Sequence, residues 1–427
     1  MNTFTEKIRL VFQDPVLRKR IFITLGLLIA FRVLAAIPIP GINVSQLNTL
    51  FAGNQFLGLL NVFSGGGLSQ LSIVMLGVGP YITGTIIMQL LTLLSPKLKA
   101  MYQEEGEAGR MKFAQYSRML TIPLAMIQAF GFLVLLERSG IISTLGTFDL
   151  IRNIAIVTAG STFLMWIGER ITEFGVGNGT SLIIFAGIIA RLPSNISQAW
   201  FTADPLHNPS QIPSILAILI GAVIITYAVV FITESERPIP VTYAKRVRGN
   251  KVYGGISTYL PLRLTQAGVI PIIFALSLLL FPQVIFQFLT AIHNGIIQAI
   301  SQWVLNVLQN QWLYAILYFI LVFAFTYFYT AITFDPHMIA ENLQKNGAFI
   351  PGVRPGQPTA AYVSWILNRL TAFGGLFLGV VAVLPLIVKG MTGIASLAIG
   401  GTALLIVVSV IVDLIKQIDA QVSMREY

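Results

Sequence analysis

The sequence predicts an all-α protein that crosses a membrane many times, and its composition supports this prediction in three ways. Hydrophobic residues make up 55% of the 427 residues, charged residues only 10%, and the mean hydropathy is +0.79. A soluble chain carries about 25% charged residues, and a single soluble core could not cover so much apolar surface. Because backbone N–H and C=O groups in lipid must form hydrogen bonds with one another, we expect helices for every span.

Span-length apolar stretches recur along the whole chain. A helix needs roughly 20 apolar residues to cross the hydrocarbon. By that criterion we predict ten spans, near residues 21–37, 71–94, 119–136, 151–168, 179–192, 212–233, 264–289, 312–332, 370–388 and 394–412. The fifth of these is short and follows three glycines, Gly175, Gly177 and Gly179.

The basic residues are distributed unevenly between the two sides of the membrane. All 27 Lys and Arg residues lie in loops on the N-terminal side, except Arg32 in the first span and Arg138, Arg152, Arg191 and Lys389. Loops rich in Lys and Arg face the cytoplasm, so we predict that both termini are cytoplasmic. The net charge of +10 then marks one membrane face and requires no nucleic-acid partner. Arg32 lies about a turn before Pro38, where its stem can snorkel to the interface.

The spans divide into two sets of five. We expect a cytoplasmic segment 1–20, an N-terminal half 21–195, an outer connection 196–211, a C-terminal half 212–412 and a cytoplasmic tail 413–427. An odd number of spans per half makes the halves point in opposite directions, and weakened helices at matching positions mark the working centre of such proteins. The second and seventh spans both carry Gly-x-x-Pro, as Gly77 with Pro80 and Gly268 with Pro271. A chance proline kink is the alternative interpretation.

The span interiors are almost free of ionisable groups. An ion-driven transporter exposes Asp, Glu, His or Lys there, and an intramembrane enzyme would need a serine–base pair, paired aspartates or a zinc site. Neither pattern is present, and the weakened helices instead carry aliphatic pairs at helical spacing, Val78 with Ile82, Ile184 with Ile188, and Ile270 with Ile273. These pairs are either ordinary helix packing or, if the helices face each other, an apolar collar that acts as a dewetted seal.

Other chemistry is sparse. The chain has no cysteine, and its histidines, His207, His293 and His337, lie far apart in expected loops, so no metal site or cofactor is expected. It also lacks G-x-x-x-x-G-K-[ST], so any driving energy must come from a partner and the chain is not expected to be an enzyme.

Polar side chains inside the spans allow two interpretations. They are Thr83, Gln89, Gln128, Thr265 and Gln266. Such groups either hold helices together, at about 0.6 kcal/mol per contact, or form the weak contacts of a seam that opens.

Two outer loops, 38–70 and 290–311, carry no charge at all. The first contains NQFLGLLNVF, which is too short to span. It either folds back into a cavity between the spans or lies flat on the outer leaflet.

Two cytoplasmic loops, 234–263 and 333–369, are long and basic. In the first, IPVTYAKRV and KVYGGIST flank RGN, which predicts a hairpin with a basic tip. The second is rich in Gly and Pro and holds Arg354 in PGVRPG. Loops of this length are usually functional, so we favour a dock for a large partner over a merely solvated face.

Motifs along nearly the whole chain point to one family. They are IPIPGI, FSGGGLSQLSI, PYITGTIIMQLL, GERITEFGVGNGTSLIIFAGI, YAKR, AGVIPIIFA, NLQKNGAFIPGVRPG and GGTALLIVV. From about residue 18 to residue 415, in this order, the sequence resembles the SecY family of protein-translocation channels, most closely its bacterial form.

The resemblance implies two inverted halves around an hourglass pore, hinged between spans five and six. A plug, a short helix around residues 55–66, would close the outer funnel, and the three glycines would be its flexible hinge into span two. The plug residues would be Leu57, Leu60, Phe63, Ser64, Gly65, Gly66 and Gly67. The pore ring would be Val78, Ile82, Ile184, Ile273 and Ile406, with Thr180, Ile188 and Ile270 nearby.

The resemblance also implies a lateral gate between spans two and three on one side and spans seven and eight on the other. Its seam would hold Thr83, Gln89, Gln128 and Thr265. Thr265 stands where many bacterial members have Asn, so the resemblance does not define the polar contacts of the closed gate.

Arg354 matches a functionally critical arginine of the family. With Arg246, Arg248 and Lys251 it would meet the motor ATPase SecA or the translating ribosome. SecE and SecG would complete a complex in the bacterial plasma membrane. The implied function is passive conduction of unfolded preproteins and their signal peptides, with apolar segments leaving sideways into lipid.

Overall fold

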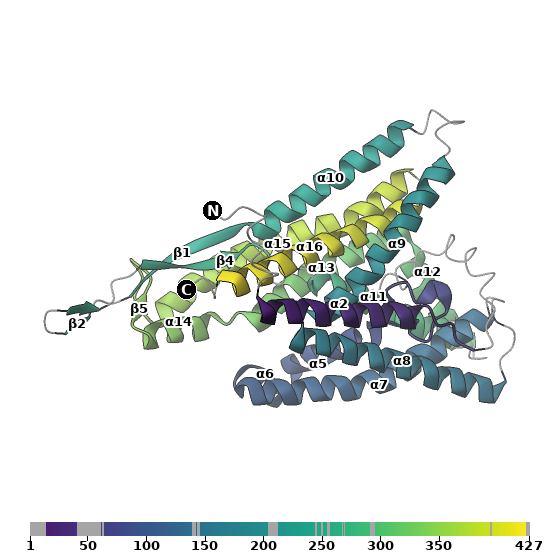
Figure 1. The fold of residues 1–427 in the computed structure, drawn as a ribbon, viewed down its shortest axis with the longest axis horizontal. Coiled ribbons are helices and arrows are strands. Elements are labelled where there is room, and N and C mark those ends of the chain that lie inside the picture. The colour runs from purple at the N-terminus through teal and green to yellow at the C-terminus, as the bar shows by residue number, and fades with distance from the viewer. Residues whose placement is uncertain are drawn as a thin grey trace. The chain divides into compact units, whose positions relative to one another are not determined.

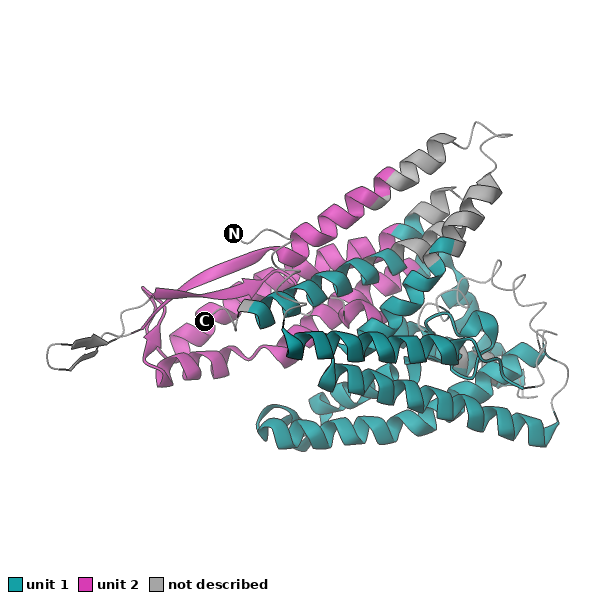
Figure 2. Ribbon diagram, in the orientation of Figure 1, with its two compact units in different colours: residues 1–218, 276–314, 385–427 teal, residues 219–275, 315–384 magenta. Residues whose placement is uncertain are grey.

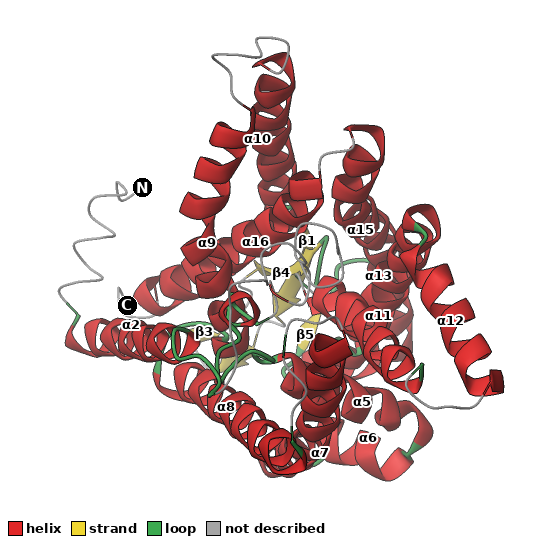
Figure 3. Ribbon diagram, turned by 90° about the vertical axis from the view of Figure 1, so that its right-hand side faces the viewer, coloured by secondary structure: helices red, strands yellow, loops and turns green. Residues whose placement is uncertain are grey.

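The computed structural model is mostly helical (Figure 1). It describes residues 14–40, 61, 64–138, 142, 146–203, 212–243, 246–248, 251–253, 257–266, 268, 270–290, 295–392 and 395–423. The strands of the described chain all lie within 236–263 and 348–349 (Figure 3). The chain separates into two compact units (Figure 2): unit 1 comprises residues 1–218, 276–314 and 385–427, and unit 2 comprises residues 219–275 and 315–384.

Unit 1 is built from helices. It contains α2 (Pro15–Ala35), the 3-10 turn η1 (Leu68–Gln70), α5 (Gly79–Leu94), α6 (Pro96–Gln103), α7 (Gly106–Arg138), α8 (Thr147–Phe174), α9 (Gly179–Ala203), α12 (Gly295–Gln309) and α16 (Ala395–Ser423). Within it α7 packs on α5 and α8, α8 packs on α2 and α9, and α9 packs on α16. Most of α11 (Ile270–Leu289) also belongs to unit 1.

Unit 2 combines helices with a small sheet. It holds α14 (Pro336–Lys345) and most of α10 (Ile212–Glu234), α13 (Gln311–Thr333) and α15 (Gln357–Thr392). Its strands are β1 (Glu236–Tyr243), β2 (Arg246–Arg248), β3 (Lys251–Tyr253), β4 (Ser257–Arg263) and β5 (Ala348–Phe349). The antiparallel sheet has the order β4-β1-β5, and β2 pairs with β3 around the basic tip. The hairpin predicted from the sequence is therefore confirmed.

Several helices are suited to lipid. Within the described residues, four are long and apolar enough to cross a membrane: Gly106–Glu137, Thr147–Phe174, Gln311–Lys345 and Gln357–Ile387. On α2, Phe22, Leu25 and Ile29 are exposed at helical spacing, as expected for a lipid-facing stripe. The multi-pass membrane class is thus confirmed, while the number of ten crossings stays a prediction.

The structure corrects the predicted starts of the second and seventh spans. The helices begin at Gly79 and Ile270, not at residues 71 and 264. Proline lacks an N–H group and is tolerated in the first helical turn, where no intrahelical partner exists. Gly-x-x-Pro therefore starts two helices, so its expected place within a helix, and the alternative of a kink, are both wrong. The structure also adds α6, α12 and α14 inside predicted loops.

Candidate functional site

The two Gly-x-x-Pro motifs adopt the same local geometry. Gly77 has φ +59° and Gly268 has φ +57°. In each case the glycine N–H donates to the carbonyl three residues earlier, Val74 O at 2.8 Å and Thr265 O at 3.3 Å. The proline three residues later is the second residue of the following helix in both units. This agreement in two separate units supports an internal repeat more strongly than the short sequence match does.

Residues 64–78, which we call the glycine segment, run into α5 without forming a long helix. Hydrogen bonds attach the segment to its surroundings: Ile39 N donates to Leu71 O at 2.8 Å, and Ile73 N donates to Ile37 O at 3.0 Å. On the α8 side, Ser161 Oγ donates to Gly77 O at 2.9 Å. Since backbone groups in an apolar environment need such partners, these bonds explain how irregular backbone persists here.

The glycine segment contains no charged residue and is almost entirely buried. Ser64, Gly65, Gly66 and Gly67 of the predicted plug are among its buried residues. Leu57, Leu60 and Phe63, like most of the predicted plug helix, lie outside the described residues. The plug assignment and the hinge role of the glycines therefore stay predictions.

The predicted pore residues of unit 1 are buried aliphatic side chains. Val78, Ile184 and Ile406 are 0% exposed and Ile82 is 6% exposed. Ile184 and Ile406 lie on α9 and α16, which pack against each other. In unit 2, Ile273 is also buried, and Ile270 is half-buried. Ile188 is buried and Thr180 half-buried. A shared ring stays a prediction.

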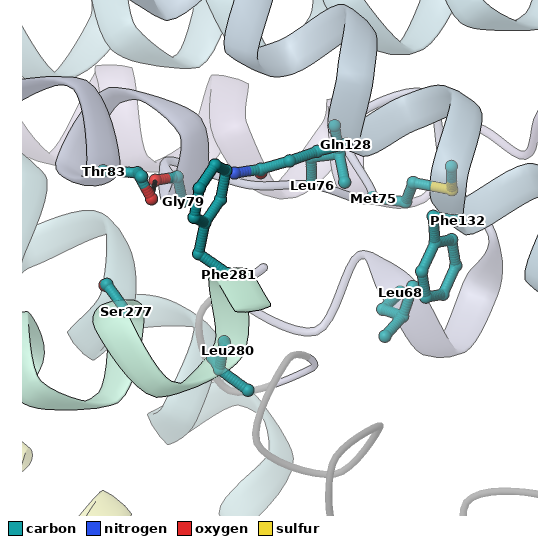
Figure 4. Close-up of a pocket in the computed structure, with 10 residues that line it drawn as sticks. All are labelled: Leu68, Met75, Leu76, Gly79, Thr83, Gln128, Phe132, Ser277, Leu280 and Phe281. Carbon is teal, nitrogen blue, oxygen red and sulfur yellow. Dashed lines mark hydrogen bonds between the residues drawn. The ribbon is translucent and has the colours of Figure 1, made fainter. Parts of the chain in front are cut away.

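A cavity of about 40 Å³ brings part of the predicted gate together (Figure 4). Ser277, Leu280 and Phe281 of α11 stand across from side chains of α5 and α7, including Thr83 and Gln128. The remaining lining residues are Leu68, Met75, Leu76, Gly79 and Phe132. The lining is mostly apolar with a few polar groups, which suits an apolar ligand or polypeptide segment.

The described polar contacts of the predicted gate residues are few. Thr83 Oγ1 donates to Gly79 O of its own helix at 3.0 Å. Gln89 and Thr265 are buried, and among the described residues Gln89 Oε1 and Thr265 Oγ1 have no hydrogen-bond partner. Buried polar atoms without partners weaken packing, so this pattern favours a weak seam over strong interhelical attachment.

Unit 2 joins the two basic loops that were predicted to be cytoplasmic into one structure. β5 of the second loop pairs with β1 of the first, with Thr242 opposite Phe349. Apolar side chains fasten this sheet to the start of α15 through the core residues Ile239, Val241, Leu262, Ala348, Ile350, Val363 and Ile366. The sequence did not reveal this pairing, because β5 has only two residues.

The predicted partner contacts lie on this structure. Arg354 is exposed between Gly352 and Gly356, which adopt φ +82° and +94°. Its carbonyl accepts from Thr359 Oγ1 at 2.8 Å, which fixes the turn. Arg246 and Arg248 lie on β2 and Lys251 on β3, with Arg248 opposite Lys251.

Arg32, the single charge of the first predicted span, has a partner in the structure. Its Nη1 donates to Gly65 O at 3.1 Å, and the snorkelling of its stem to the interface stays a prediction. The sequence carried one signal of this contact, a single charge inside an apolar span. No local pattern connects that charge to a residue 33 positions away.

Together these features define a class: a multi-pass helical membrane protein with buried aliphatic residues, a mostly apolar cavity and a small sheet that carries basic residues. The SecY family model matches residues 72–415. The chain is 41% identical to the protein translocase subunit SecY of Corynebacterium glutamicum, over 97% of each chain. The chain therefore belongs to the SecY family.

Solved structures agree on the fold. One is a SecY channel whose plug domain is described as stabilising the closed state and maintaining a membrane seal. Its TM-score is 0.66, with 20% identity over 95% of this chain and 92% of that one. Another is Sec61 in a canine ribosome–channel complex, with a TM-score of 0.64 and 18% identity over 95% and 92% of the chains.

Proposed function

We propose that this chain is the pore-forming subunit of a protein translocase. It conducts unfolded secretory polypeptides across the membrane and releases apolar segments sideways into lipid. The observation that carries this proposal is the glycine segment with the aliphatic residues beside it, buried and uncharged in a chain of the SecY family. Such a surface cannot coordinate an ion or recognise a solute, so it suits a cargo of variable sequence.

The seal works by excluding water. Val78, Ile82, Ile184, Ile273 and Ile406 would close around whatever segment is passing, because aliphatic side chains repack without forming specific bonds. Between passengers, the plug helix near residues 55–66 closes the outer side. A narrow aliphatic constriction gates by dewetting, so few ions cross with the cargo.

Lateral release uses the cavity between α5, α7 and α11. The cavity is lined mostly by apolar side chains, and the Thr83 hydroxyl that lines it bonds within its own helix. An apolar passenger helix is solvated better by lipid than by a wet pore. Opening this seam therefore lets such a helix leave into the bilayer.

We also propose a membrane topology and a set of partners. Ten helices cross a bacterial plasma membrane in two inverted halves, with both termini and the sheet of unit 2 in the cytoplasm. Arg246, Arg248, Lys251 and Arg354 contact a SecA motor or a ribosome, and SecE and SecG are the small membrane subunits. The exposed position of Arg354 supports a docking role.

Deletion of residues 57–65 tests the channel. The full chain, with the subunits that copurify, is placed in planar lipid bilayers and its ion conductance measured. We expect the deletion to raise the conductance at least about tenfold and to leave motor-driven transport of an unfolded preprotein measurable. A pore that stays fully closed after the deletion contradicts the plug, and a chain that transports no preprotein contradicts the channel.

A further inference from the structure

The helix α12 of unit 1 has three faces that differ in chemistry, and one of them packs against the protein. Ser301 and Leu308 are buried, and Ile297 and Val304 are half-buried. With about 3.6 residues per turn, these positions lie on one side of the helix. The Ser301 hydroxyl donates to Ile297 O of the same helix at 2.7 Å, so its donor is satisfied on the packed face.

A second face of α12 is apolar and exposed. Ile296 is 73% exposed, Ile300 53% and Trp303 66%, and the half-buried Val307 continues the row. These positions form one stripe over about three turns, roughly a third of a turn away from the packed face. Contact between such a stripe and water is unfavourable, so this face requires a cover.

The third face of α12 is polar and neutral. It consists of Gln298, Gln302, Asn306 and Gln309, which are all exposed. An apolar face beside a polar face is the pattern of a helix that lies in the plane of a membrane surface. Since the sequence of α12 has no charged residue, attraction to anionic lipid does not contribute, and only the apolar face can attach the helix.

The helix α12 leads directly into a segment that is suited to cross a membrane. Only Asn310 separates α12 from α13. Asn310 N donates to Asn306 O at 3.2 Å, and Asn310 O accepts from Tyr314 N at 2.8 Å. The segment Gln311–Lys345 is long and apolar enough for a membrane span. A crossing that starts at Gln311 puts the end of α12 at a membrane surface.

The length of α12 decides what covers its apolar face. The polar boundary on each side of the hydrocarbon is only about 5–8 Å thick, whereas a helix of 15 residues is about 22 Å long. An upright α12 would touch lipid with its last turn alone and leave Ile296 in water. A flat α12 brings the whole stripe to the acyl chains. Trp303, and the exposed Trp312 beyond the junction, are of the residue type enriched at this boundary.

We propose that α12 is an interfacial anchor. Its apolar face, with Ile296, Ile300 and Trp303, is embedded in the leaflet where α13 begins, and its neutral polar face points to headgroups and water. In the topology proposed above this is the outer leaflet. The anchor fixes the depth at which α13 enters the membrane. The proposal requires only a multi-pass membrane protein, so it stands or fails separately from conduction of polypeptides.

Spin labels on two faces of α12 test the anchor. The chain has no cysteine, so Ile296→Cys and Ile300→Cys each place the only thiol of the chain on the apolar face. Gln298→Cys and Gln302→Cys are the matched controls, because they are exposed on the same helix. The full chain, with the subunits that copurify, is placed in phosphatidylcholine vesicles. Collision rates of the nitroxide are then measured with oxygen and with a water-soluble nickel chelate.

Oxygen concentrates in hydrocarbon, whereas the chelate stays in water. We expect the ratio of oxygen to nickel collisions to be at least about tenfold higher on the apolar face than at the two control positions. Equal ratios on both faces, or a low ratio at Ile296 alone, would show that α12 stands in water and would overturn the anchor. Low collision rates with both reagents at Ile296 and Ile300 would show a protein cover, which overturns it as well.

A second measurement tests the means of attachment. Replacement of about a third of the lipid by anionic phosphatidylglycerol should change the ratio at Ile296 less than about twofold, because α12 is uncharged. Trp303→Gln should lower that ratio about threefold by weakening the apolar face, whereas Trp303→Phe should keep it. An unchanged ratio in Trp303→Gln, or a large rise with anionic lipid, contradicts attachment through this face.

Discussion

The glycine segment of unit 1 and the sheet of unit 2 differ in charge, in exposure and in the contacts that stabilise them. The glycine segment has no charged residue and is closed on both sides by helices. The sheet exposes charged side chains, such as Arg263, which pairs with Glu236 on the neighbouring strand at 3.3 Å. One region is held by close backbone approach, whereas the other is held by a regular ladder and a small apolar core.

This difference shows where substitutions should matter. In the glycine segment, backbone atoms pack so closely that an added methyl group has no room. We therefore expect substitutions there to act through shape. On the exposed side of the sheet, side chains can change without disturbing the core beneath. We therefore expect substitutions there to act through charge. Three substitutions test this contrast.

The largest effect is expected where α8 meets the glycine segment. A Cβ on Gly160 would overlap with Ile73 O, and a backbone atom cannot move as a side chain can. We expect Gly160→Ala to lower the free energy of unfolding by about 1–3 kcal/mol, measured as a lower thermal midpoint in detergent. Gly26 on α2 has no heavy atom within 4 Å of its Cβ position, so Gly26→Ala should not destabilise the protein. Equal losses in both variants would contradict the argument from shape.

A smaller effect, of a different kind, is expected at Arg354. Its side chain is exposed, so Arg354→Glu should leave the thermal midpoint unchanged. It should weaken binding of a SecA-type motor about tenfold, or about 1.4 kcal/mol, in a binding assay at low salt. Lys345→Glu is the control in the same loop, because the Lys345 charge is already paired with Glu341 at 2.8 Å. Equal losses in both variants would show that net charge alone, and not the Arg354 turn, attracts the partner.

Much of the helical architecture could be predicted because apolar length is a local property. Each predicted span overlaps a helix of the structure. The starts of the second and seventh helices were missed because Gly77 and Gly268 adopt positive φ, which the residue pattern permits but does not require. The helix α12 was not predicted because its 15 residues are fewer than the roughly 20 that a span needs, although Ile296, Ile300 and Trp303 follow helical spacing.

Long-range contacts could not be predicted from any local pattern. The Arg32–Gly65 hydrogen bond joins a span to a loop, and the β1–β5 pairing joins two loops separated by several helices. The cavity is different. Thr83 and Gln128 were expected on one seam because of the family resemblance, and both line this cavity, while the gate itself stays a prediction. Composition alone suggested only that polar groups lay somewhere inside the spans.

The smallest effect is expected at Thr83, although it was predicted as a gate residue. Its hydroxyl bonds to Gly79 O within α5, so Thr83→Val removes no bond across the seam. We expect the conductance of Thr83→Val to change less than about twofold. Gln128 lines the same cavity from α7. Gln128→Leu should change the free energy of pore opening by more than Thr83→Val does. The change should reach up to about 0.6 kcal/mol, the typical value of an interhelical hydrogen bond in membranes. If Thr83→Val had the larger effect, its hydroxyl would have to bond across the seam in a closed state, and the weak seam inferred from these contacts would be wrong.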